Sequence, residues 1–157
     1  MKDFRSIIGT DTAYNFHSHT QFCDGHADIA AFAEAAAKTE MHHYGYSPHS
    51  PVPIDSPCNM KAEDVPAYFA EVEAAQRRWP QMHIYRSMEV DYLGTQWGPS
   101  SRYFRDLGLD YVIGSVHFIP AKDDRSLYID IDGSPERFMR NMHTHFGDDI
   151  EYVARTF

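Results

Sequence analysis

The chain has 157 residues, 43% of them hydrophobic and 14% aromatic, which is enough for one buried core and predicts a single domain or a part of one. A formal net charge of −9 repels the phosphate backbone of nucleic acids, so no nucleic-acid partner is expected. The sequence has no apolar run long enough to span a bilayer, and residues 1–12 show no secretory signal, so we expect a cytoplasmic protein that does not contact membranes.

The pattern of apolar and turn-forming residues predicts alternating strands and helices. In chain order we expect strand 13–16, helix 29–40, strand 43–46, helix 65–79, strand 82–93, helix 101–107, strand 109–119, an extended segment over 127–131 and helix 135–146. Alternation of this kind, with short connections, is typical of an α/β domain with parallel strands.

Residues that favour helix ends support these boundaries. Asp28, Asp64 and Ser134 precede three of the helices, where a side-chain oxygen can accept a hydrogen bond from a free backbone N–H. Pro80 ends the second helix. The prolines within residues 47–59 exclude regular structure from that segment.

The C-terminal part of the sequence gives two further expectations. Residues 111–116 form a near-continuous apolar run, which suits a parallel strand covered on both faces better than an edge strand. Residues 148–157 are amphipathic but carry no signal for a helix end. The sequence therefore predicts one domain over residues 1–157 that is truncated, with the chain stopping inside or at the edge of an element.

Histidine and carboxylate side chains follow the first predicted strand. His17 and His19 are two residues apart and so point to the same side, which suits a site for zinc, iron or manganese. The turn at Gly25 brings Asp24 and His26 close to that pair. His26 is the expected ligand, and Asp24 is expected to bridge or to support the ligands. Taken alone, the pair His17 and His19 would fit two exposed loop histidines better than metal ligands.

Later strands extend the same set of side chains. His49 lies in the proline-rich segment after the second strand, and His117 ends the apolar run. Glu89 stands in an apolar strand, where an unpaired carboxylate would be costly to bury and a metal ion would compensate its charge. Asp91 shares the face of Glu89 and is expected to support a ligand or to form a salt bridge. Because the carboxyl ends of parallel strands form one edge of a sheet, we expect these residues to meet there.

Five segments of the sequence resemble, in order and spacing, the motifs of the PHP (polymerase and histidinol phosphatase) family, and most closely its histidinol-phosphate phosphatase branch. They are His17-Ser18-His19-Thr20, Cys23-Asp24-Gly25-His26-Ala27, Ser47-Pro48-His49-Ser50-Pro51, Met88-Glu89-Val90-Asp91-Tyr92 and Ile113-Gly114-Ser115-Val116-His117-Phe118. The resemblance runs from Asn15 to about Phe157. It implies a distorted seven-stranded (β/α) barrel, similar to a TIM barrel, of which this chain would be the N-terminal part.

The resemblance also implies a function. It gives metal-ligand roles to His17, His19, His26, His49, Glu89 and His117. Two or three divalent ions (zinc, manganese or iron) would then hydrolyse a small phosphorylated substrate, histidinol phosphate, to histidinol and phosphate in histidine biosynthesis. The metals would activate a water molecule, so no serine or cysteine nucleophile is required.

The sequence departs from the family pattern at two points. Pro48 stands where the family commonly has an aspartate. No segment after His117 matches the histidine and the Asp-x-His pair of the family's later strands, and His143-Thr144-His145 lies in a helical pattern where such positions diverge. Another PHP phosphoesterase, such as a nuclease, or a catalytically silent metal-binding fragment is therefore the alternative. The sequence indicates no oligomeric state, and its candidate phosphate-binding arginines are Arg86, Arg125 and Arg155.

Overall fold

The main sheet has four parallel strands, whose order in space is their order along the chain. The computed structural model describes residues 4–157. The strands are β1 (Tyr14–Asn15), β2 (His43–Tyr46), β3 (His83–Asp91) and β4 (Tyr111–Ser115). The sheet is curled, and sequential parallel strands of this kind form the wall of a (β/α) barrel. The predicted α/β class with parallel strands is confirmed for this part of the chain.

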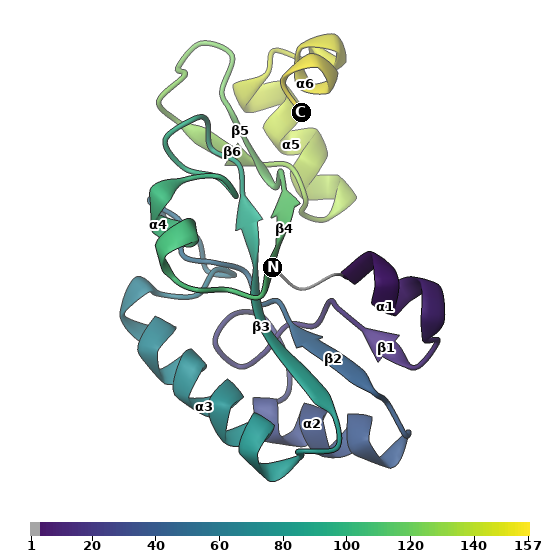
Figure 1. Cartoon of the computed structure of the whole chain (residues 1–157). Coiled ribbons are helices and arrows are strands. Elements are labelled where there is room, and N and C mark those ends of the chain that lie inside the picture. The colour runs from purple at the N-terminus through teal and green to yellow at the C-terminus, as the bar shows by residue number, and fades with distance from the viewer. Residues whose placement is uncertain (1–3) are drawn as a thin grey trace.

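Helices α2 (Ile29–Lys38) and α3 (Val65–Arg78) cover one face of the main sheet (Figure 1), and further helices precede, connect or follow the strands. The further helices are α1 (Phe4–Thr10), a 3-10 turn (Ala62–Asp64), α4 (Arg102–Asp106), α5 (Pro135–His145) and α6 (Ile150–Thr156). Within residues 4–157, none of these helices has both the length and the apolarity that a membrane crossing requires.

Two of the three predicted helix caps form. The Asp28 carboxylate accepts a hydrogen bond from the backbone N–H of Ala31 at 2.7 Å, and Ser134 accepts one from Arg137. Asp64 makes no such bond, so its predicted capping role is wrong. The reason is that Asp64 closes the 3-10 turn and already has helical backbone angles, whereas a capping residue needs an extended backbone.

The predicted strand over 109–119 is in fact two strands in two sheets. β4 ends at Ser115, and β5 (Phe118–Pro120) pairs antiparallel with β6 (Tyr128–Asp130). Between the two strands, the backbone N–H of His117 donates to the side chain of Asp91 at 3.0 Å, which diverts the chain from the sheet. In the described part of the chain β4 is an edge strand and is only partly buried, so the expectation of a strand covered on both faces is wrong.

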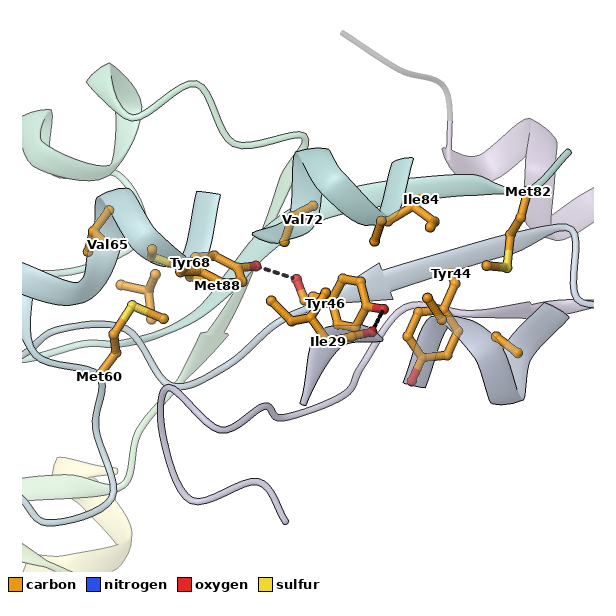
Figure 2. Packing of buried hydrophobic residues seen from close by; sticks show 14 of the residues in the cluster. Ile29, Tyr44, Tyr46, Met60, Val65, Tyr68, Val72, Met82, Ile84 and Met88 are labelled. Carbon is orange, nitrogen blue, oxygen red and sulfur yellow. Dashed lines mark hydrogen bonds between the residues drawn. The ribbon is translucent and has the colours of Figure 1, made fainter. Parts of the chain in front are cut away.

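The main core lies between the sheet and helices α2 and α3 (Figure 2). Tyr68 of α3 is fully buried, and the single proton of its hydroxyl is shared between two carbonyl oxygens, those of Ser87 in β3, at 2.6 Å, and Tyr46 in β2, at 3.1 Å. The hydroxyl of Tyr46 donates to the carbonyl of Ile29, the first residue of α2. These buried hydrogen bonds tie both helices to neighbouring strands just before those strands reach the functional edge of the sheet.

The opposite face of the sheet carries aromatic rings. Phe4 of α1, a helix that the sequence did not predict, contacts the rings of Phe16, Tyr85 and Tyr111 with centroids 5.1 to 5.3 Å apart. The Tyr111 hydroxyl crosses from β4 and donates to the carbonyl of Phe16, next to β1. It passes over Gly45 of β2, where a Cβ atom would lie only 2.0 Å from the hydroxyl oxygen.

A second, smaller core joins the C-terminal elements. It lies between the β5–β6 hairpin and helices α5 and α6, and includes the buried side chains of Ile119, Met142, Phe146 and Val153. The predicted extended segment 127–131 and helix 135–146 are both present, as β6 and α5.

Candidate metal centre

The candidate site lies at the C-terminal edge of the main sheet. His17 and His19 follow β1, His49 follows β2, Glu89 lies in β3 and His117 follows β4. The sheet pairing continues past β2 as a bridge between His49 and Glu89, in which Glu89 N–H donates to the carbonyl of Pro48 at 3.0 Å. This bridge holds the proline-rich loop against β3 and so fixes His49 beside Glu89.

Glu89 is the centre of the arrangement. Its side chain is buried, and within residues 4–157 it forms no ion pair with a lysine or arginine; four imidazoles surround it instead. Oε2 lies 3.1 Å from His19 Nε2, 3.4 Å from His49 Nδ1 and 3.9 Å from His17 Nε2. Oε1 lies 3.6 Å from His117 Nε2. One carboxylate therefore touches the histidines of three different strand ends.

Three overlapping groups of side chains could each hold a metal ion, with donor atoms within 4.8 Å of one another. The groups are His17–His19–Glu89, His19–Asp24–His49 and His49–Glu89–His117. His19, His49 and Glu89 each belong to two groups. Imidazole nitrogen and carboxylate oxygen are the donors that zinc, manganese and iron accept, and the sharing of residues suits ions that lie side by side.

Neighbouring polar groups orient the imidazoles. His17 Nδ1 contacts the hydroxyl of Ser47 at 2.8 Å, and His19 Nδ1 contacts Asp24 Oδ1 at 2.7 Å. Asp91 is fully buried, and its Oδ1 lies 2.9 Å from His117 Nδ1. In His17 and His19 the nitrogen that faces away from Glu89 is hydrogen-bonded, which is how metal-binding histidines are usually oriented. His117 Nδ1 is close to the Asp91 carboxylate but lacks hydrogen-bond geometry, so it is a buried nitrogen without a hydrogen-bond partner.

The electrostatics follow from crowding and burial. Hydrogen bonds to Glu89 and Asp24 raise the pKa of His19. Burial opposes the ionisation of Glu89, but the hydrogen bond with His19 and the charge of the nearby imidazoles hold the pKa of Glu89 below its ordinary value. Burial, together with the charge of His19, lowers the pKa of His49. Glu89 is thus an anion, as a metal ligand must be.

A buried nitrogen without a hydrogen-bond partner also indicates that these residues suit a metal ion. His49 Nδ1 is buried without a hydrogen-bond partner, although it lies 3.4 Å from Glu89 Oε2. A buried polar atom without a partner is costly, and a cation between the nitrogen and the carboxylate would remove that cost.

The structure brings five of the six predicted ligands together. His26 is exposed and belongs to none of the groups formed within residues 4–157, so its ligand role stays a prediction. Asp24 lies among the donors, next to the ligands as expected, because its Oδ2 is 3.7 Å from His49 Nε2 and it belongs to one group. Asp91 takes a supporting position behind His117, as one of its two predicted roles requires.

Sequence reasoning missed two polar side chains that serve the site. Ser47 contacts His17, and the amide nitrogen of Asn59 donates to Asp91 Oδ2 at 3.3 Å and to the carbonyl of Ser50 at 2.8 Å. Ser47 and Asn59 are the first and last residues of the proline-rich segment 47–59. The sequence of this segment gave no indication that its two ends meet at the site.

A cavity of about 100 Å³ adjoins the donors. Its lining combines residues of the site, of the proline-rich loop and of the β5–β6 hairpin: Asp24, His49, Ser56, Cys58, Asn59, His117, Phe118, Asp130 and Asp132. None of the three candidate arginines is in this lining. Arg86 pairs with Glu73, Arg125 with the hydroxyl of Tyr152, and Arg155 with Glu151.

Known proteins resemble this chain in sequence and in fold. A family model described as PHP domain matches residues 15–152. A protein of Deinococcus radiodurans named a probable histidinol-phosphatase is 34% identical over an alignment of 115 residues, and the match covers 67% of this chain and 42% of that protein. A crystal structure from Listeria monocytogenes, hisK, named as a histidinol phosphatase, is 22% identical and superimposes with a TM-score of 0.65 over 80% of this chain and 51% of that one.

The chain thus spans about half, or less, of the length of these relatives. The crystal structure supports the fold, and the family model covers nearly all of the sequence, including every predicted metal ligand. The Deinococcus relative is named a probable histidinol-phosphatase, and this chain belongs to the PHP domain family.

Proposed function

We propose that this chain forms the metal centre of a phosphatase that hydrolyses histidinol phosphate to histidinol and phosphate, a step of histidine biosynthesis. The observation that carries the proposal is the sharing of Glu89, His19 and His49 between overlapping donor groups. Such sharing suits two or three divalent ions (zinc, manganese or iron), and adjacent ions are typical of phosphate-ester hydrolysis. The names of the relatives support the substrate. The four-stranded sheet would be part of a seven-stranded barrel.

The ions, when bound, would supply a water molecule of lowered pKa and polarise the phosphate oxygens. Glu89 would be a ligand together with the histidines around it, since Oε2 lies near His17 and His19 and Oε1 lies near His117. Asp91 would keep His117 in one orientation through Nδ1, leaving Nε2 free for a metal.

The cysteines near the site do not offer an alternative nucleophile. Burial raises the pKa of Cys23, and burial together with the charge of Asp24 raises the pKa of Cys58. Both side chains are therefore thiols at neutral pH, and a thiol is a far weaker nucleophile than a thiolate. The side chains of the site support hydrolysis by metal-activated water.

The test is phosphate release from histidinol phosphate by the metal-loaded chain, with bound manganese or zinc measured in the same sample. Glu89→Gln removes the shared carboxylate charge and should abolish release and lower the metal content. His83→Gln is the matched control, because His83 is an exposed histidine at the opposite end of the strands and should leave both unchanged. Release that survives Glu89→Gln would refute the proposed site.

One rival has a specific observation in its favour. The chain spans 42% of the Deinococcus protein, so it could be a metal-binding segment without turnover of its own. Metal bound in the stoichiometry of two or three, without phosphate release, would identify this case. Release from nucleotides but not from histidinol phosphate would instead indicate another PHP phosphoesterase.

A further inference from the structure

Asp132 lies beside the metal centre, although it was not among the predicted ligands. It follows β6 and lines the cavity of about 100 Å³ next to the donor groups. It also lines a second cavity, of about 490 Å³, beside the end of β4 at Gly114 and Ser115. His117 is the one other residue whose side chain the two linings share. Asp132 and His117 therefore form the ridge between the two cavities.

The distance between these side chains fits donors of one ion. Asp132 Oδ2 lies 3.7 Å from His117 Nε2, almost as close as Glu89 Oε1, which is 3.6 Å from the same nitrogen. Nitrogen and oxygen ligands stand about 2.0–2.2 Å from a zinc ion, so two donors of one ion are at most about 4.4 Å apart. His117 Nε2 thus has two carboxylate oxygens within this limit. Asp132 belongs to none of the donor groups formed within 4.8 Å among residues 4–157, so its carboxylate would have to turn to share an ion with Glu89 and His49.

The backbone holds Asp132 in this place. Ile131 N–H donates to the carbonyl oxygen of His117 at 2.8 Å, and Asp132 N–H donates to Asp130 Oδ1 at 2.8 Å. Asp130 is in turn fixed by an ion pair with Arg137 at 3.1 Å. The position of residue 132 is therefore tied to the ligand residue itself, while its carboxylate is 74% exposed and free to turn toward an ion.

We propose that Asp132 is a fourth donor to the ion held by His49, Glu89 and His117. Three protein donors leave positions of a four- to six-coordinate ion open, and a carboxylate oxygen is a ligand that zinc, manganese and iron all accept. Among the described residues, Asp132 has no lysine or arginine partner in an ion pair, in contrast to Asp130. Its charge is therefore available to the ion. This inference depends on one part of the proposed function, namely that the chain binds metal ions at this centre, and not on the identity of the substrate.

The experiment measures metal binding rather than turnover. The full chain is titrated with Co²⁺ and with Zn²⁺ against a competing chelator, and the visible absorption of bound Co²⁺ reports the number and type of its ligands. Asp132→Ala should weaken one binding step by about 10- to 100-fold or more, the range found when a group next to a ligand is lost. The remaining steps should be unchanged.

Two further variants separate ligation from charge. Asp123→Ala removes an equally exposed carboxylate from the turn between β5 and β6 and should bind metal as the unchanged chain does. Asp132→His replaces the carboxylate with a neutral donor and should restore the weakened step with an altered Co²⁺ spectrum. A residue that acts by its charge alone would not be replaced by histidine.

Each outcome decides the matter. Wild-type affinity and spectrum in Asp132→Ala, or failure of Asp132→His to restore the step, would overturn the proposal. Absence of bound metal in the unchanged chain would overturn both this proposal and the proposed function. Metal binding that depends on Asp132 in a chain that releases no phosphate would uphold the ligand and reject the phosphatase activity of the chain.

Discussion

Replacing Tyr68 with phenylalanine tests how the core supports the site. The change removes one hydroxyl and keeps the ring, so the packing against the sheet is retained. In the folded chain that hydroxyl donates to the carbonyl oxygens of Tyr46 and Ser87, and the side chain is fully buried. A net hydrogen bond contributes about 0.5–1.5 kcal/mol, and two buried carbonyls lose a partner. We therefore expect a loss of about 1–2 kcal/mol in the free energy of unfolding.

The assay is thermal unfolding followed by circular dichroism. In a chain of about this length each kcal/mol corresponds to roughly 2–4 °C, so Tyr68→Phe should lower Tm by roughly 2–8 °C. The control is Tyr92→Phe, because Tyr92 is 49% exposed and surface changes usually stay within about 0.5 kcal/mol. If both variants unfold at the wild-type temperature, the hydroxyl of Tyr68 does not join α3 to the two strands as argued.

Three shorter predictions follow from single positions. A Cβ at Gly25 would lie 2.4 Å from the backbone nitrogen of Thr20, so Gly25→Ala should displace the loop of Asp24 and weaken metal binding in chelator competition, with an unchanged circular dichroism spectrum; unchanged affinity would contradict this. Asp28→Ala removes the cap of α2 and should cost about 0.5–2 kcal/mol in denaturant unfolding, whereas Asp28→Asn should cost little. Burial, aided by the charge of His83, lowers the pKa of His43 in the folded chain. The unfolded chain then binds more protons below the ordinary histidine value of 6.5, so stability falls as pH falls through that value. His43→Gln should make this dependence shallower, and equal slopes in denaturant unfolding at several pH values would refute the assignment.

The sequence was sufficient where the determining contacts are local. Asp28 and Ser134 cap helices through backbone N–H groups three residues away, and both were predicted. The convergence of the strand-end histidines was predictable for a different reason. Parallel strands place their C-terminal ends on one edge, so His49 and His117 meet once the strands are identified.

The failures have distant causes. The strand over 109–119 breaks because Asp91 accepts the backbone N–H of His117, and the apolar run itself carries no sign of this contact. Helix α1 is held by the ring of Phe4 on aromatic residues of β3, of β4 and of the segment after β1, which local propensity does not report. The relative positions of Asp24 and His26 depend on how tightly the backbone at Gly25 packs against Thr20.

The crossing of Tyr111 over Gly45 has a consequence for how this chain can change over evolution. The hydroxyl occupies the volume of the missing Cβ at position 45, so neither residue can be replaced by a larger one independently of the other. A side chain at position 45 becomes tolerable only after Tyr111 has become smaller. Related sequences should therefore show correlated substitution at these two positions, which are 66 residues apart along the chain (111 − 45). Chains that carry alanine or a larger residue at position 45 should lack tyrosine at position 111.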